Sequence, residues 1–305
     1  MVVERDASRG WSRVDRLVLG VLVATVLLSA VFLTHPWYEP RPDAAIYIST
    51  ARSIAAGQGI TYLETPSVLR PPGLPLLISP LMGGEGAPDF RRLNALISLF
   101  GAVGVVLLFV YQRVRVGWLL ALLGSLAIWL NPGYQRLCNQ VMSDVPGIAL
   151  VLLCLLIERW ASRAASTGRE LVLGVAIGAS AVLRSSVALL VPAILVARLL
   201  QQIENRSAPW SSFWWHRTGL LVVTVLVFLL PWSAYESTHA PELPVDQTYL
   251  YSRSVGMWHV DPANPGSPRV PIADVLRRPG EHITPILDVL GSRMQVRFQP
   301  GESTA

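Results

Sequence analysis

The sequence contains no lysine, so all 25 of its basic residues are arginine. Charge of either sign is scarce, because charged residues make up 15% of the chain, whereas a soluble globular domain has about 25%. Apolar residues make up 52%, and the mean hydropathy is +0.45. Much of the chain must therefore lie where charge is costly, which predicts a membrane protein.

The sequence also lacks the usual motifs of soluble enzymes. It has no P-loop, no dinucleotide-binding fingerprint, no Ser-His-Asp set and no cysteine metal cluster. His35, His239 and His259 do not follow metal-ligand spacing. Cys138 and Cys154 would lie about 24 Å apart on one helix, too far for a disulfide, so two free thiols are expected.

Long apolar runs indicate an all-α polytopic membrane protein with about seven transmembrane helices. The first run, 14–34, begins beside four arginines, at positions 5, 9, 13 and 16, and has no cleavage site, so we expect a retained first transmembrane helix. Six further transmembrane helices are expected within 93–232. Their apolar runs are 93–111, 117–130, 145–157, 171–183, 187–200 and 220–232.

The arginines predict the orientation of these helices. Segments 1–16, 112–116, 158–170 and 201–217 carry arginine and alternate with the other connections. The positive-inside rule places them in the cytoplasm, together with the N-terminus at 1–13. This pattern accounts for the formal charge of +5 without a nucleic-acid partner. We expect a multi-pass protein of the bacterial inner membrane, in contact with membrane lipid.

The apolar stretch 74–82 is half as long as a span, which needs about 20 residues. We interpret it as a short interfacial or re-entrant helix. If it crossed the membrane, every later segment would be inverted and most arginine clusters would lie outside.

The remaining segments then form the outer side. The first outer loop, 35–92, is long, and long loops often carry function, so we expect interfacial helices and the active site there. Pro42 and Gly57 delimit a helix over 42–56, which places Asp43 and Tyr47 on one face. An extended stretch, 60–69, leads to Arg70 before two prolines.

Two later outer positions carry charge. Asp144 ends the loop 131–144 at the mouth of the next span. Arg184 lies between two apolar runs on the outer side, where it breaks the positive-inside pattern and so invites an anionic ligand. The last outer segment, 233–305, is polar and ends without a clear closing element, as a truncated chain would.

In their order, these segments resemble the GT-C membrane glycosyltransferases. The first outer loop of that superfamily is similar to PDAAIYISTARSIAAGQGI followed by LRPPGLPLLISPL, and the later segments to FRRLNALISLFGAV and NPGYQRLCNQVMSDVP. The segments LRSS and LLPW also match. The resemblance is strongest to bacterial relatives of protein O-mannosyltransferases and of the lipid A aminoarabinose transferase.

The resemblance implies transfer of a sugar from a polyprenyl-phosphate donor to a glycan, lipid or protein acceptor on the outer face. Asp43 is then the expected catalytic base, and Asp144 a second catalytic residue that orients the acceptor or binds a metal. Arg70 and Arg184 are expected to bind the substrate's phosphate or sugar, and Tyr47 to stack on the sugar. Both aspartates also suit helix starts, which is the structural alternative.

Two departures from the family pattern matter. Ala44 stands where several relatives carry a second acidic residue, which weakens any claim of metal binding and leaves a Mg²⁺ or Mn²⁺ cofactor open. Many relatives also have further spans and a folded outer domain. The alternatives are a transporter or flippase for lipid-linked sugars, or a non-catalytic membrane assembly partner. Charge at the outer mouths rather than at mid-membrane favours transfer over transport.

Overall fold

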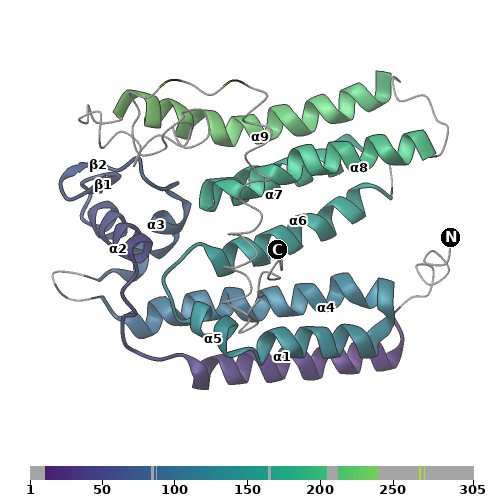
Figure 1. The fold of residues 1–305 in the computed structure, drawn as a ribbon, viewed down its shortest axis with the longest axis horizontal. Coiled ribbons are helices and arrows are strands. Elements are labelled where there is room, and N and C mark those ends of the chain that lie inside the picture. Colours follow the sequence, from purple (N-terminus) through teal and green to yellow (C-terminus); the bar gives the residue numbers. More distant parts are fainter. Residues whose placement is uncertain are drawn as a thin grey trace, which may run out of the picture. The chain divides into compact units, whose positions relative to one another are not determined.

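Helices dominate the part of the chain that the computed structural model describes, which is residues 11–83, 86, 88–163, 166–204, 212–239, 268 and 271. Figure 1 shows the elements in chain order: α1 Arg13–Leu33, α2 Pro42–Ala55, β1 Thr61–Tyr62, β2 Thr65–Pro66, α3 Gly73–Ile78, the 3-10 helix η2 Ser79–Leu81, α4 Phe90–Trp129, α5 Pro132–Cys138, α6 Asp144–Ala161, α7 Thr167–Leu183, the 3-10 helix η3 Ser185–Leu189, α8 Leu190–Glu204 and α9 Ser212–His239. The predicted all-α class is confirmed.

Four helical stretches among the described residues are long and apolar enough to cross a membrane. They are Arg13–Leu33, Phe90–Trp129, Ser185–Glu204 and Trp215–His239. The helices α6 and α7, with 18 and 17 residues, are somewhat short for a span. The polytopic class is confirmed, whereas the count of seven spans stays a prediction.

The long helix α4 is a hairpin of two helices. Gly117 interrupts it with φ of +81° and ψ of 169°, a backbone conformation that glycine adopts readily and other residues rarely do. Arg113, just before this turn, bonds to Asp15 at the start of α1, whereas Trp129 at the far end of α4 bonds to Ser29. The two predicted runs 93–111 and 117–130 are therefore separate legs that run in opposite directions along α1.

The connections that follow α1, α4 and α7 gather at one end of the bundle, which we call the loop end (Figure 1). Asn139 accepts a hydrogen bond from the backbone N–H of His35 at 3.0 Å, and Asn94 donates to the carbonyl of His35 at 3.0 Å. Buried polar side chains thus fix the start of the segment 35–92 to α4 and α5.

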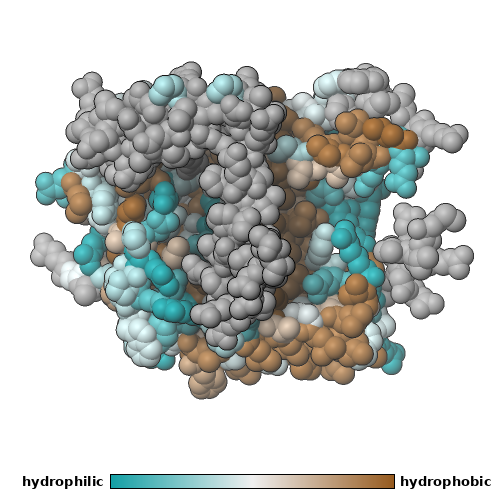
Figure 2. Space-filling model, viewed as in Figure 1, coloured by the Kyte–Doolittle hydropathy of each residue, from teal (hydrophilic) through white to brown (hydrophobic). Residues whose placement is uncertain are grey.

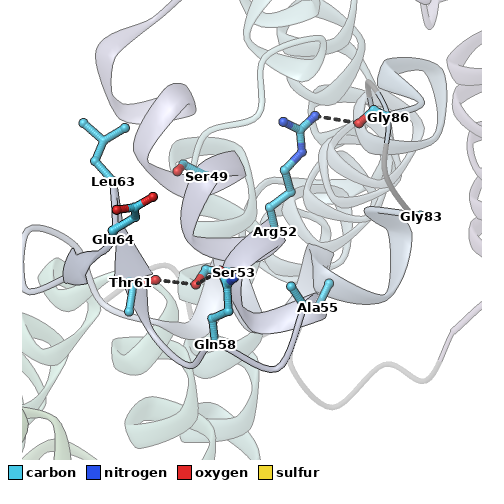
Figure 3. Close-up of a pocket in the computed structure, with 11 residues that line it drawn as sticks. Ser49, Arg52, Ser53, Ala55, Gln58, Thr61, Leu63, Glu64, Gly83 and Gly86 are labelled. Carbon is cyan, nitrogen blue, oxygen red and sulfur yellow. Dashed lines mark hydrogen bonds between the residues drawn. The ribbon is translucent and has the colours of Figure 1, made fainter.

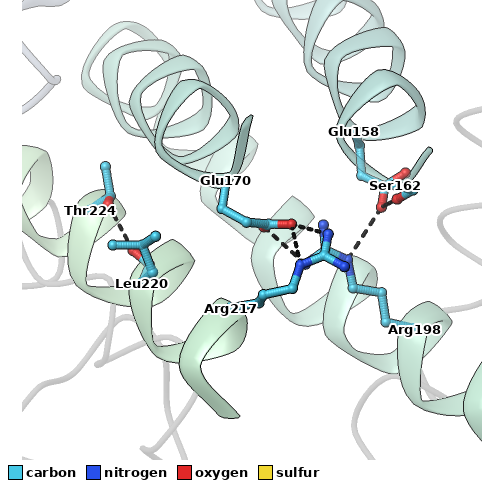
Figure 4. A network of polar contacts seen from close by, with 7 residues as sticks. All are labelled: Glu158, Ser162, Glu170, Arg198, Arg217, Leu220 and Thr224. Atoms are coloured by element: carbon cyan, nitrogen blue, oxygen red, sulfur yellow. Dashed lines mark hydrogen bonds and ion pairs between the residues drawn. The ribbon is translucent and has the colours of Figure 1, made fainter. Parts of the chain in front are cut away.

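A charged network ties four helices together at the opposite end (Figure 4). Glu170 of α7 is fully buried and pairs with Arg198 of α8 at 3.1 Å and with Arg217 of α9. Glu158 of α6 accepts from the same Arg198 at 3.3 Å. The buried carboxylate of Glu170 is thereby compensated, as a charge at this depth must be.

Small residues let α7 and α9 approach closely. A Cβ atom on Gly174 would lie 2.7 Å from Cβ of Thr224, and one on Gly178 would lie 2.6 Å from Cδ2 of Phe228. These glycines are four residues apart on one helix face, the spacing that membrane helices use for tight contact.

The segment 35–92, predicted as the first outer loop, partly follows its predicted structure. The helix expected over 42–56 is α2, and 74–82 forms the short α3 and η2 rather than a span. The prediction of one extended stretch over 60–69 is wrong, because the chain reverses direction there and β1 and β2 pair as a tight antiparallel hairpin. The helix α9 continues to His239, past the predicted end at 232. Beyond it, all of 240–305 except 268 and 271 lies outside the described residues.

Candidate active site

Asp43 lies in the first turn of α2 but does not cap the helix. The N-cap residue is Arg41, which makes no side-chain capping bond. Oδ1 of Asp43 instead accepts a hydrogen bond from Nη2 of Arg70 at 2.7 Å. Both side chains are about one-third exposed, at 31% and 39%. This carboxylate is therefore held by a guanidinium from the loop before α3 and stays open to a ligand.

Asp144, the first residue of α6, forms a second pair of the same kind. Its Oδ1 lies 3.0 Å from Nη2 of Arg184, and the side chains are 33% and 36% exposed. Arg184 follows α7 in an extended conformation. Its side chain crosses α6 at Gly147, where a Cβ atom would lie 2.4 Å from Cδ of Arg184. Gly147 therefore provides the space through which Arg184 reaches Asp144.

Tyr47 and Ser143 join the two pairs. The hydroxyl of Tyr47 lies 3.0 Å from Oγ of Ser143, and Nη1 of Arg184 donates to the same Oγ at 3.2 Å. The structure thus brings all five predicted site residues together. We call Asp43, Tyr47, Arg70, Ser143, Asp144 and Arg184 the ion-pair cluster.

Ser143 was not predicted as a site residue. Its position directly before Asp144 indicated a helix start, and it is the N-cap of α6, but its side chain makes no capping bond. Its hydroxyl bonds across to Tyr47 and Arg184 instead. The sequence held no signal for this use beyond a serine at the predicted outer mouth.

The cluster combines two negative and two positive side chains around a neutral phenol. Burial raises the pKa of Tyr47, an effect that its bond to Ser143 and the nearby Arg70 and Arg184 partly offset. The hydrogen bond to Asp43 raises the pKa of Arg70, and the guanidinium of Arg70 therefore stays charged. The cluster can bind an anion through its arginines and take up a proton through its carboxylates.

Tyr47 is only 3% exposed in this conformation. Its predicted stacking on a donor sugar would require the ring to become exposed. In this conformation the side chain instead contacts Ser143 through its hydroxyl. Ala44 is fully buried, so an acidic residue at this position would face the core rather than the cluster. No group of three or more His, Cys, Asp or Glu side chains suited to a metal occurs among the described residues.

A hollow lies on the face of α2 that points away from the ion-pair cluster. It has a volume of about 580 Å³ and is lined by Ser49, Arg52, Ser53, Ala55, Ala56, Gln58, Thr61, Leu63, Glu64, Gly83 and Gly86. In Figure 3, Arg52 reaches toward the carbonyl of Gly86, and Ser53 faces Thr61. At helical spacing these α2 residues point away from Asp43 and Tyr47, so this hollow is separate from the ion-pair cluster.

Comparison with known proteins supports the fold. No protein-family model and no curated protein matches the sequence. Two crystal structures of ArnT from Cupriavidus metallidurans do match, one bound to undecaprenyl phosphate and one in the apo state. Both have a TM-score of 0.56 and 18% identity, over 80% and 79% of this chain. The chain has the fold of ArnT. The sequence resemblance and this structural likeness therefore point to the same fold.

The match is partial in length. This chain covers 44% of the ArnT chain in both comparisons, which is under half of that protein. The shared fold includes most of the helices described above, whereas activity, substrate and partners do not follow from it. The roles of the residues in the ion-pair cluster therefore remain predictions.

Proposed function

We propose that this chain transfers a sugar from a polyprenyl-phosphate carrier to a glycan, lipid or protein acceptor on the outer face of the bacterial inner membrane. One observation carries the proposal: two carboxylates and two guanidiniums meet at the loop end of an ArnT-like fold. An ArnT structure with this fold holds undecaprenyl phosphate, which makes a lipid-linked donor the natural substrate class.

In the proposed reaction, Asp43 accepts the proton of an acceptor hydroxyl while that oxygen attacks the anomeric carbon of the sugar. The bond from this carbon to the phosphate oxygen breaks, and the polyprenyl phosphate leaves with the electron pair. Arg70 and Arg184 stabilise the charge that develops on the phosphate, since guanidinium groups match phosphate oxygens. Asp144 orients the acceptor.

The pairing in the ligand-free structure suggests how substrate binding prepares the base. Arg70 is bound to Asp43 and Arg184 to Asp144. A phosphate that binds both arginines would compete with the two carboxylates for the same guanidinium groups. Donor binding would thus release Asp43 from Arg70 and leave its carboxylate free to accept a hydrogen bond from the acceptor hydroxyl.

A transfer assay tests the proposal. Membranes that contain the chain receive a synthetic polyprenyl-phosphate sugar, and product is compared for wild type, Asp43→Asn and Asp144→Asn. Asp89→Asn is the matched control, because Asp89 caps α4 and pairs with Arg92 outside the cluster. We expect a loss of at least about 100-fold for Asp43→Asn, a smaller loss for Asp144→Asn, and wild-type transfer for Asp89→Asn.

Equal product from wild type and both cluster variants would refute the assigned roles. If no protein yields product but the lipid-linked sugar crosses the membrane, the transporter or flippase is correct. A parallel assay with EDTA, followed by added Mg²⁺ or Mn²⁺, tests the metal. Because Arg70 and Arg184 already provide positive charge, we expect transfer to persist in EDTA.

A further inference from the structure

A groove between α1 and α4 lies apart from the ion-pair cluster. Its volume is about 300 Å³. It is lined by Leu27, Ala30 and Val31 of α1, by Thr34 directly after that helix, and by Arg91, Ala95 and Leu99 of α4. Thr34 and Arg91 mark the loop end of the groove, because α1 ends at Leu33 and α4 begins at Phe90. The remaining residues run from there along the two helices.

The apolar wall of the groove is exposed. Leu27 is 39% exposed, Val31 64% and Leu99 47%. Figure 2 shows hydrophobic side chains along the lower edge, where α1 and α4 lie in the matching view of Figure 1. In a bundle that spans a membrane, hydrocarbon chains of lipids cover such a surface.

Arg91 adds a charge at the head of this apolar groove. Its neighbour Arg92 forms an ion pair with Asp89 at 3.0 Å. No carboxylate lies within ion-pair distance of Arg91 among the described residues. The backbone N–H of Arg91 donates to Asp89, but its guanidinium makes no hydrogen bond within the described part of the chain. The groove thus combines an apolar wall with the positive charge of Arg91, which is unpaired among the described residues.

We propose that this groove binds one anionic phospholipid, with its phosphate on Arg91 and one acyl chain between α1 and α4. Guanidinium groups bind phosphate through two parallel hydrogen bonds, which suits the head of the groove. A zwitterionic lipid carries its own cation beside the phosphate and should bind less well. This site is independent of the proposed transferase activity.

Native mass spectrometry of the purified full chain in detergent tests the site, with phosphatidylglycerol and phosphatidylcholine as probes. Arg91→Gln removes the charge from the groove. Arg92→Gln is the matched control, since it makes the same change one residue away, on a side chain that is 73% exposed and paired with Asp89. Ala95→Phe fills the groove and leaves the charge unchanged.

We expect one tightly bound phosphatidylglycerol on wild type and on Arg92→Gln. Binding should be about tenfold weaker for Arg91→Gln, as expected for one charge-assisted contact of about 1.4 kcal/mol, and also reduced for Ala95→Phe. Equal losses for Arg91→Gln and Arg92→Gln, or equal binding of phosphatidylcholine, would overturn the proposal. It would also fail if undecaprenyl phosphate displaced the phospholipid in an Arg91-dependent way, because the groove would then be a carrier site.

Discussion

At the scale of single residues, the cluster depends on hydrogen bonds that no local sequence pattern reveals. Asp43 and Arg70 are 27 positions apart, and Arg184 and Ser143 are 41 apart. Both aspartates and both arginines could be selected from their places at the predicted outer mouths and from the family resemblance. The pairing of each aspartate with its arginine could not, since no local pattern shows which loop folds back on which helix.

The contact between Tyr47 and Ser143 allows a test by a double-mutant cycle. Tyr47→Phe and Ser143→Ala each remove one partner of the 3.0 Å bond. We expect the two changes to be non-additive in thermal stability, with a coupling of about 0.5–1.5 kcal/mol, because the second change finds the bond already gone. Strict additivity would show that this hydrogen bond contributes nothing measurable.

Cys138 provides a prediction about pH. Burial raises the pKa of this thiol, at the end of α5, to about 12. The thiolate is the reactive form, so in Cys154→Ala protein at pH 9 we expect alkylation roughly a thousandfold slower than for an exposed thiol. Denaturation in SDS should restore the rate.

The same pKa sets the sign of a stability effect. The folded pKa of Cys138 lies above the unfolded value of about 9, so the unfolded state releases its proton first as the pH rises. The contribution of Cys138 to stability is complete below pH 9 and declines between about pH 9 and 12. Rapid alkylation of the folded protein at pH 9 would contradict the buried position of this thiol.

At the scale of elements, α2 and α3 could be predicted because Pro42, Gly57 and the two prolines after Arg70 are strong boundary signals. The hairpin of β1 and β2 could not. Leu63 and Glu64 form its turn with φ of +51° and +68°, where asparagine and glycine are the usual residues. Pro231 lies inside α9, a position that sequence rules for soluble helices treat as a boundary.

The close packing of α7 on α9 gives a prediction with an internal control. Gly178→Ala places a Cβ atom 2.6 Å from Phe228, so we expect a loss of about 1–3 kcal/mol from overpacking. Gly219→Ala, on α9, meets nothing within 4 Å, and alanine favours a helix by about 1 kcal/mol over glycine. In thermal unfolding in detergent, the Tm of Gly178→Ala should therefore lie below that of wild type, and the Tm of Gly219→Ala above it.

At the scale of the whole molecule, the orientation in the membrane is the main prediction that the fold leaves untested. Among the described residues of the arginine segments, Arg113 bonds to Asp15 at the start of α1 and Arg217 pairs with Glu170 near the start of α7. Both lie at the end opposite the ion-pair cluster, as the positive-inside rule requires if the cluster faces outward. Reporter fusions after residues 60, 114, 140, 165 and 210 test this. We expect outer readings at 60 and 140 and cytoplasmic readings at 114, 165 and 210. A cytoplasmic reading at 60 or 140 would invert the topology.

The central claim is that the ion-pair cluster binds a polyprenyl phosphate by drawing its arginines away from its aspartates. The most direct test is the dissociation constant of undecaprenyl phosphate for wild type, Arg70→Gln, Asp43→Asn and the control Arg136→Gln, which lies outside the cluster in a pair with Glu39.

We predict that Arg70→Gln weakens binding about tenfold or more, that Arg136→Gln leaves it unchanged, and that Asp43→Asn binds at least as tightly as wild type because Arg70 is no longer occupied. Equal dissociation constants for wild type and Arg70→Gln, or weaker binding by Asp43→Asn than by Arg70→Gln, would contradict the account.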